Sequence, residues 1–208
     1  MPFKAVAFDL DGTLVMEKSS WWKLHQYFGT YNQSLSNMRD YEQGKITYSE
    51  FMSLDIGLWQ PRPHKSVIEK VLLSYNLTPN LLHVIKVLKS KEYQLFIITT
   101  APDILANAVA GQLGIKYVAS NGFTFDEKGY LTKNAIFNVD LVNKDQAFVK
   151  LLSLTGIMCK DCIAVGDSKY DKRFLTASGL GIAFNPDATL QKEAKIIIKD
   201  MKEILDYI

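Results

Sequence analysis

Long apolar runs, cysteine and histidine are scarce in this sequence, and positive and negative charges nearly balance. No stretch approaches the ~20 consecutive apolar residues of a transmembrane helix, so we expect no membrane span. The formal net charge of +2 is too small to favour nucleic acid or an anionic membrane as a partner. A strand-like segment already begins at residue 5, which leaves no room for a signal peptide, so we expect a cytoplasmic protein.

The two cysteines do not indicate a redox or metal site. Cys159 and Cys162 form a C-x-x-C spacing that precedes a strand-like segment, whereas a thioredoxin-like pair would follow a strand at a helix start. A structural zinc would need two further ligands, and the three histidines are distant in sequence. We interpret the pair as a turn cysteine and a small buried cysteine.

What the sequence does contain is an alternation of short apolar runs with helical patterns. This alternation predicts an α/β fold with a doubly wound, Rossmann-like parallel sheet, whose strands are buried on both faces. The predicted strands are residues 5–8, 95–98, 163–165, 180–184 and 196–198. The predicted helices are residues 78–89, where Thr78 is the N-cap, and then 102–114, 143–156 and 171–178.

Two inserts interrupt this alternation. Residues 16–76 are helical and rich in aromatics, with capping patterns at Thr47–Glu50 and Ser66–Glu69, and they are too long for a crossover loop. We predict a small helical cap there, leaving 1–15 and 77–208 as the core. Its aromatic residues suit the cap interior, and lining of a substrate pocket remains open. The second insert, residues 123–137, predicts a β-hairpin.

Polar clusters follow the predicted strands or open a helix. Asp9 and Asp11 follow the first strand, Thr99 and Thr100 the second, and a Gly-Asp-x-x-x-Asp segment the third; Lys144 lies at a helix start. Ligands of open α/β sheets bind at the carboxyl ends of the strands, so these clusters should meet in one crevice.

These residue types are suited to phosphoryl transfer. Clustered carboxylates need a cation between them, and oxygen ligands favour Mg²⁺. Mg²⁺ and a lysine neutralise charge on a transferring phosphoryl group. One carboxylate can attack phosphorus, and a second, two residues later, can protonate the leaving oxygen and then activate water.

Together these segments resemble the haloacid-dehalogenase superfamily, in particular its phosphoserine-phosphatase-like branch, over nearly the whole chain. The resemblance implies a phosphatase with a helical cap inserted after the first strand. It implies that Asp9 is the nucleophile and Asp11 the general acid and base. Mg²⁺ would bind the Asp9 carboxylate, the Asp11 carbonyl and the carboxylate of Asp167, with Asp171 supporting this metal shell. Phosphate would bind Thr99, the Thr100 amide and Lys144.

The sequence departs from that branch at several positions. The branch has two glycines where this chain has Thr100 and Ala101, and an asparagine where it has Tyr170. In that branch an arginine of the cap pairs with the substrate carboxylate, and in this chain Asp55 aligns with that arginine. A cap acid that meets the substrate amine aligns with Glu17 or Lys18, and Arg62 is another cap candidate for binding the substrate. These differences predict that phosphoserine is a poor substrate.

The leading hypothesis is therefore Mg²⁺-dependent hydrolysis of a small phosphorylated metabolite through an aspartyl-phosphate on Asp9. A phosphotransferase or phosphomutase of the same superfamily is an alternative that differs in the phosphoryl acceptor. A phospho-acceptor signalling module is a further alternative, although such modules place the acidic pair and the acceptor on different strands. Neither the substrate nor the oligomeric state follows from the sequence.

Overall fold

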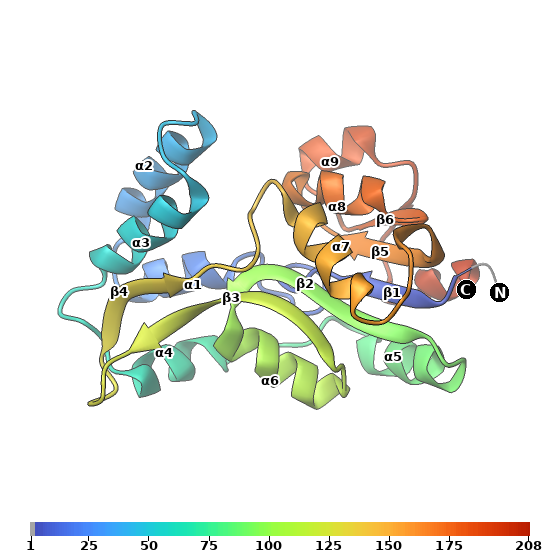
Figure 1. Cartoon of the computed structure of the whole chain (residues 1–208), viewed down its shortest axis with the longest axis horizontal. Helices are drawn as coiled ribbons and strands as arrows, with labels where there is room; N and C mark the ends of the chain where they lie inside the picture. The colour runs from blue at the N-terminus through green and yellow to red at the C-terminus, as the bar shows by residue number, and fades with distance from the viewer. Residues whose placement is uncertain (1–2) are drawn as a thin grey trace.

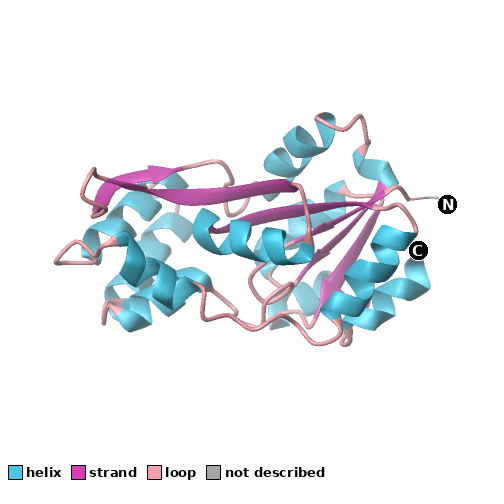
Figure 2. Cartoon of the chain, turned by 90° about the horizontal axis from the view of Figure 1, so that it is seen from below, coloured by secondary structure: helices cyan, strands magenta, loops and turns pink. Residues whose placement is uncertain are grey.

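The computed structural model describes residues 3–208 and contains a twisted sheet between helices, with a helical lobe beside it (Figures 1 and 2). The first two residues of the predicted core range 1–15 lie outside the described residues. The elements in chain order are β1 (Ala5–Phe8), α1 (Ser20–Tyr27), α2 (Tyr31–Glu42), α3 (Tyr48–Leu58), α4 (Lys65–Leu72), α5 (Leu81–Ser90), β2 (Gln94–Pro102), α6 (Asp103–Leu113), β3 (Tyr117–Phe125), β4 (Leu131–Ile136), α7 (Lys144–Ser153), η1 (Cys159–Asp161), β5 (Cys162–Gly166), η2 (Lys169–Asp171), α8 (Lys172–Ala177), β6 (Leu180–Phe184), α9 (Ala188–Glu193), β7 (Ile197–Ile198) and η3 (Met201–Tyr207).

The strands form a seven-stranded sheet in the order β4-β3-β2-β1-β5-β6-β7. All neighbouring strands are parallel except β3 and β4, which form the antiparallel hairpin. The first strand in the chain is therefore the central one, and β2 and β5 lie on either side of it. The predicted doubly wound sheet, helical insert and hairpin are all confirmed.

The two faces of β1 explain its unbroken apolar sequence. Val6 and Phe8 belong to the larger buried cluster, which includes residues of α5 and α6 on one face of the sheet. Ala5 and Ala7 belong to the second cluster, with residues of α7, α8 and α9 on the opposite face. Figure 1 shows these two helical layers on opposite sides of the strands. A strand covered on both faces has no position at which a polar side chain could reach water.

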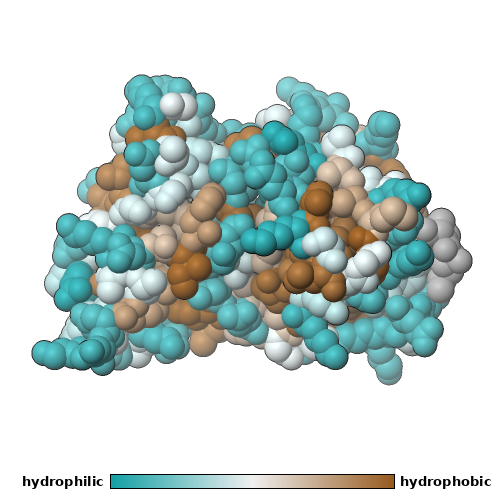
Figure 3. Space-filling model, in the orientation of Figure 1, coloured by the Kyte–Doolittle hydropathy of each residue, from teal (hydrophilic) through white to brown (hydrophobic). Residues whose placement is uncertain are grey.

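The insert between β1 and β2 contains α1 to α4. Leu24, Trp59 and Ile68 belong to the same buried cluster as β1, so α1 and α4 share the core of the sheet. The α2–α3 hairpin stands apart in Figure 1 and contributes to a separate aromatic cluster that contains Tyr48 and Phe51. In the space-filling view, the outline is notched between this hairpin and the lobe of α8 and α9 (Figure 3). Within residues 3–208, no helix is both long and apolar enough to cross a membrane.

The predicted start of the helix over 78–89 is wrong. The helix begins at Leu81, and Asn80 precedes it with a left-handed φ of 65°. Thr78 does not cap this helix, because its hydroxyl donates to the Thr13 carbonyl oxygen at 2.6 Å. That contact ties the chain returning from the cap to the loop that leaves β1, and a local capping pattern cannot reveal it.

The predicted cap at Ser66–Glu69 is also wrong, because α4 begins at Lys65 and His64 is its N-cap. Two backbone hydrogen bonds anchor this segment to the β3–β4 hairpin, from Lys65 N to Gly129 O at 2.8 Å and from Leu131 N to Pro63 O at 2.9 Å. The tertiary contact therefore shifts the helix start. The other capping box, between Thr47 and Glu50, is present as predicted.

Candidate active site

The predicted nucleophile, Asp9, is the first residue after β1 and lies at the carboxyl edge of the sheet. It is only 5% exposed, and Lys144 Nζ lies 2.8 Å from its Oδ1. Burial raises the pKa of Asp9 well above its usual range, and the ammonium of Lys144 opposes that shift. Lys144 is the first residue of α7, so a helix that packs against β2 and β3 brings its charge to β1.

Asp171 holds Lys144 from the other side, with 2.6 Å between its Oδ1 and Nζ. Its Oδ2 accepts from the backbone amides of Asp167 and Ser168, at 3.1 and 3.0 Å, and from the Ser168 hydroxyl. A Cβ on Gly166 would lie 2.6 Å from the Asp171 Cγ, so only glycine leaves room for this carboxylate. Burial by itself lowers the Lys144 pKa, but the two neighbouring carboxylates raise it above the ordinary value, so this lysine remains charged.

Three buried carboxylates form a group that can hold a metal ion. One oxygen from each of Asp9, Asp167 and Asp171 lies within 4.8 Å of the others. Burial, and then the charge of Asp171, raise the pKa of Asp167 to about 6. Gly12 is essential to this packing, because a Cβ at its position would lie 2.2 Å from Asp167 Oδ2. Crowded oxygen donors of like charge fit a small hard cation such as Mg²⁺.

Asp11 points away from this group and toward the cap. Its Oδ2 accepts from the backbone amide and the hydroxyl of Ser20, both at 2.7 Å, at the first residue of α1. Its Oδ1 is buried without a hydrogen-bond partner among the described residues. Burial raises the pKa of Asp11 to about 6, despite the Ser20 hydrogen bonds that oppose it. A carboxyl that titrates close to neutral pH can both give and take a proton.

The two threonines lie in the second half of β2, which extends to Pro102 and not to residue 98 as predicted. The Thr99 hydroxyl oxygen accepts from the Ala101 amide at 3.0 Å, which leaves its own hydrogen free to donate. Thr100 contacts the cap, since the Trp21 indole N–H donates to its carbonyl oxygen at 3.0 Å. Both threonines therefore lie where the cap meets the carboxyl edge of the sheet.

Only one of the four cap candidates lies at the carboxylates. Lys18 Nζ lies 2.6 Å from Asp167 Oδ2, and the lysine side chain is 57% exposed. Glu17 instead contacts Lys23, with 3.1 Å between carboxylate and ammonium. Arg62 contacts the β3–β4 hairpin, where its guanidinium lies 3.4 Å from the Asp126 carboxylate. The structure therefore places the Lys18 ammonium at Asp167, whereas Glu17 pairs with Lys23.

Asp55, the fourth candidate, is buried inside the cap and takes part in a closed network. Its Oδ2 accepts from His25 Nε2 at 3.0 Å and from the Ser34 hydroxyl at 2.9 Å, and its Oδ1 accepts from Asn37 at 2.7 Å. The Trp59 indole, which can only donate, contacts His25 Nδ1 at 3.1 Å. His25 therefore carries its proton on Nε2. This carboxylate has no direct route to a substrate.

Sequence reasoning did not assign Ser20 to the site, and it left open whether the aromatics of the insert, which include Trp21, line a pocket. It also missed an ionic contact between the cap and the core, in which Glu42 accepts from Lys169 Nζ and from the Tyr170 hydroxyl, each at 2.7 Å. Ser20 stands beside a helix-start signal, but no local pattern indicates that it would bind Asp11. These contacts depend on how the insert folds back over the sheet.

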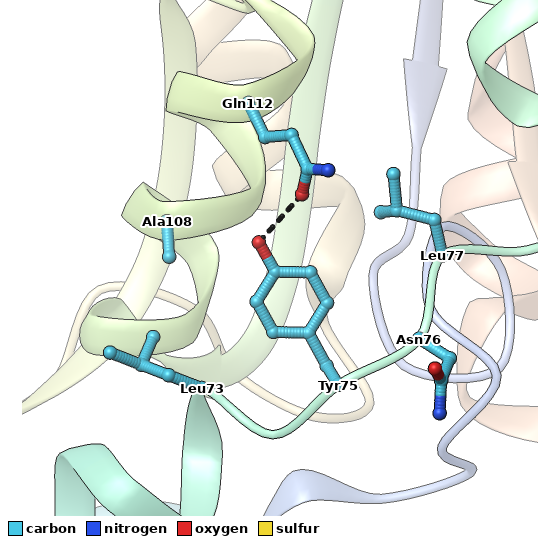
Figure 4. A pocket seen from close by; sticks show the side chains of 6 residues that line it. All are labelled: Leu73, Tyr75, Asn76, Leu77, Ala108 and Gln112. Carbon is cyan, nitrogen blue, oxygen red and sulfur yellow. Dashed lines mark hydrogen bonds between the residues drawn. The ribbon is translucent and has the colours of Figure 1, made fainter.

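A hollow of about 470 Å³ lies elsewhere, between the linker that returns from the cap and α6. Figure 4 shows Tyr75 reaching across it, and the Tyr75 hydroxyl donates to Gln112 Oε1 at 2.8 Å. Its lining is Leu73, Tyr75, Asn76, Leu77, Ala108 and Gln112, and it contains no charged side chain. It therefore offers no counter-charge for a phosphorylated ligand.

Buried carboxylates and a lysine meet at the carboxyl edge of a mainly parallel sheet, so the fold and the site define a doubly wound α/β protein with a carboxylate-lined crevice. The sequence model of the haloacid dehalogenase-like hydrolases matches residues 3–179, and the chain belongs to this family. A HAD family hydrolase from Salmonella enterica serovar Typhi is 25% identical with a TM-score of 0.83, and the match covers 95% of this chain and 68% of that one. A phosphoserine phosphatase solved as a phospho-aspartyl intermediate analogue is 26% identical with a TM-score of 0.81, over 99% of both chains.

Curated relatives are phosphoserine phosphatases. That of Archaeoglobus fulgidus is 25% identical over 203 residues, which cover 96% of this chain and 55% of the relative. That of Streptomyces coelicolor is 28% identical over 130 residues, which cover 62% of this chain and 32% of the relative. The chain thus spans between a third and just over half of the length of these two relatives. The predicted resemblance to the phosphoserine-phosphatase-like branch is confirmed.

Proposed function

We propose that this protein is a Mg²⁺-dependent phosphatase that hydrolyses a small phosphomonoester through an aspartyl-phosphate on Asp9. The observation that carries the proposal is the arrangement of Asp9 between a buried lysine, 2.8 Å away, and a group of carboxylates that can hold a metal ion. The Asp9 carboxylate, the Asp11 carbonyl and the Asp167 carboxylate would hold Mg²⁺, which when bound neutralises charge on the phosphoryl group.

In the first step, an Asp9 oxygen attacks phosphorus while the bond between phosphorus and the leaving oxygen breaks. Asp11 donates its proton to that oxygen, which leaves as an alcohol. In the second step, the Asp11 carboxylate takes a proton from water, which attacks the phosphorus and releases Asp9 and inorganic phosphate. Lys144, the Thr99 hydroxyl and the Thr100 amide would hold the phosphoryl oxygens throughout.

The substrate class follows from the residues around the crevice. An amine on the substrate would meet Lys18, a like charge, and the cap arginine position is occupied by the buried Asp55. Trp21, which is partly buried, brings an aromatic ring of the cap to Thr100. We therefore expect a small phosphomonoester with an apolar or ring-bearing leaving group to be a better substrate than phosphoserine. A soluble metabolite, and neither nucleic acid nor a membrane, remains the predicted partner, and the cytoplasm the predicted compartment.

Chemical trapping tests the mechanism. The protein is incubated with p-nitrophenyl phosphate and Mg²⁺, quenched with acid, and digested for mass spectrometry. We expect one phosphoryl group on the peptide that contains Asp9, and none in an Asp9→Asn variant. A phosphoryl group on another residue, or turnover by Asp9→Asn, would overturn the assignment. Ranking kcat/KM over a panel of phosphorylated metabolites, with and without alcohol acceptors, then separates hydrolysis from phosphoryl transfer.

A further inference from the structure

The end of β2 is irregular at the proposed phosphate site. Ile98 pairs with Ala119 of β3, and the next paired residues are Pro102 and Asn121, so β2 advances four positions while β3 advances two. A bulge of this kind takes backbone groups out of the regular ladder, and buried backbone groups then need other hydrogen-bond partners. Residues 99–101 therefore depend on hydrogen bonds from outside the regular pairing of the sheet.

One peptide group in this bulge is hydrogen-bonded at both ends. Its carbonyl, that of Thr100, accepts from the Trp21 indole N–H at 3.0 Å. Its amide, that of Ala101, donates to the Thr99 hydroxyl oxygen at 3.0 Å. A threonine that accepts from the backbone amide two residues later forms a local turn, which here fixes the Thr99 side chain. A side chain of the cap and the Thr99 hydroxyl are therefore joined through a single peptide group.

The indole of Trp21 has a defined place between the cap and the core. Its ring centroid lies 5.8 Å from that of Trp59, at the end of α3, and 5.3 Å from that of Phe123, in β3. The preceding residue, Ser20, donates to Asp11 through its amide and its hydroxyl, which anchors the first turn of α1. An indole packed between two rings on an anchored helix has few alternative rotamers, so its N–H stays directed at the Thr100 carbonyl.

We propose that Trp21 is a positioning residue that holds the peptide group after Thr100, so that the hydrogen of the Thr99 hydroxyl points to a phosphoryl oxygen. The inference rests on the proposed phosphatase function and adds to it a residue outside the phosphate-binding set. A peptide group whose carbonyl accepts a hydrogen bond donates more strongly through its N–H, because successive hydrogen bonds polarise one another. The Thr99 oxygen is thereby kept as an acceptor toward the backbone, and its own hydrogen is left for the phosphate.

The test compares Trp21→Phe with Trp22→Phe, which alters the next residue of the same helix, whose ring packs edge-on against Tyr31. Inorganic phosphate is titrated calorimetrically in the presence of Mg²⁺, and kcat and KM are measured with p-nitrophenyl phosphate. We expect Trp21→Phe to weaken phosphate binding by about two- to tenfold, as for loss of one hydrogen bond, and to lower kcat/KM by a similar factor. Trp22→Phe should change neither value.

A second variant separates the hydrogen bond from the packing of the ring. Benzothienylalanine at position 21 replaces the indole N–H by sulfur while the ring keeps nearly the same shape. We expect this protein to show the same loss of phosphate affinity as Trp21→Phe, with the wild-type melting temperature. Wild-type phosphate affinity with benzothienylalanine at position 21 would overturn the proposal, because the N–H would then contribute nothing.

A variant at Thr99 decides whether Trp21 acts through that hydroxyl. Thr99→Val removes the hydroxyl and should weaken phosphate binding at least as much as Trp21→Phe. Adding Trp21→Phe to Thr99→Val should cause no further loss, because the hydroxyl that the indole positions is already absent. Losses that multiply in the double variant would mean that the indole affects phosphate by another route, and they would overturn the proposal.

The phosphate titration does not depend on turnover, so two kinds of failure can be distinguished. Absence of phosphate binding by the wild-type protein with Mg²⁺ would overturn the proposed function and this inference with it. Phosphate binding by the wild-type protein that both changes at position 21 leave intact would overturn this inference alone.

Discussion

The core and the cap each bury a carboxylate, and the two are used in opposite ways. Asp9 in the core and Asp55 in the cap are 5% and 1% exposed, so they differ little in burial. Both oxygens of Asp55 accept hydrogen bonds from neutral donors within the cap. Asp9 instead shares one buried lysine with Asp171 and lies beside a third carboxylate.

Asp9 and Asp55 differ in how completely hydrogen bonds and opposite charges compensate the negative charge of the carboxylates. Around Asp9, the carboxylates of Asp9, Asp167 and Asp171 share two ammonium groups, those of Lys144 and Lys18, and among the described residues Asp11 has no ammonium partner. Burial without full compensation raises carboxyl pKa values, as it does here for Asp9 and Asp11. An incompletely neutralised group of carboxylates can bind a cation and move a proton, whereas a closed network mainly contributes to structure.

The largest expected effect is that of Asp9→Asn, which keeps the shape but removes the attacking carboxylate. We expect kcat with p-nitrophenyl phosphate to fall by at least about 10⁴-fold. The melting temperature should not fall, because the substitution removes one of the crowded negative charges. Asp103→Asn, at the start of α6 and away from the carboxylate group, is the control and should stay active. Comparable activity of both variants would remove Asp9 from the mechanism.

In the cap, Asp55→Ala should lower the free energy of unfolding by about 3 kcal/mol, because it leaves several buried donors without an acceptor. Denaturant unfolding measures this change. Asp55→Asn keeps an acceptor oxygen and should lose less. The kcat/KM of the folded fraction should stay within a factor of two to three of wild type. A selective loss of activity toward one substrate, without loss of stability, would show that Asp55 reaches the crevice.

The Mg²⁺ affinity of the core and its stability without metal should both depend on pH. Because burial raises the Asp167 pKa to about 6, the group is protonated below that pH and ionised above it. Mg²⁺ binds the carboxylate, so its affinity at pH 5 should be about tenfold weaker than at pH 7.5 by calorimetry. Without metal, the folded state binds the proton more tightly than the unfolded chain, so stability should decrease as pH rises through about 6. A pH-independent affinity would argue against Asp167 as a ligand.

The smallest expected effect concerns Lys18, whose ammonium lies 2.6 Å from the Asp167 carboxylate. Lys18→Met should strengthen Mg²⁺ binding by about two- to fivefold, in line with the modest strength of a partly exposed ion pair. Lys23→Met is the matched control, because Lys23 pairs with Glu17 and the Ser74 carbonyl. Calorimetric titration with Mg²⁺ measures both. Weaker binding by Lys18→Met would mean that the lysine does not compete for Asp167.

Much of the fold and the position of the carboxylates could be predicted from the sequence. Unbroken apolar runs mark strands buried on both faces, and parallel strands bring their carboxyl ends to one edge. Asp9, Asp167 and Lys144 therefore meet in the structure although they are far apart in the chain. Local capping patterns also predicted the start of a helix where no tertiary contact competes with them, as at Thr47, which caps α3.

Alignment with the family does not specify which cap side chains face the sheet. Asp55 was aligned with a substrate-binding position but faces the interior of the cap, while Lys18, and not Glu17, lies at the carboxylates. Small helices can pack in several rotations, and a rotation changes which side chains face the sheet. Trp21 carries no motif, and only its packing against the end of β2 brings its indole N–H to the Thr100 carbonyl oxygen.

The sequence by itself thus determined the sheet, the order of its polar strand ends and the chemistry of the residues placed there, because strand burial and parallel pairing are encoded locally. The tertiary structure alone decided which cap side chains reach that chemistry. Ser20 binds Asp11, and Trp21 meets Thr100, only after the insert between β1 and β2 has folded back over the carboxyl edge. Contacts between segments distant in sequence depend on the packing of whole helices, which no short pattern of residues specifies.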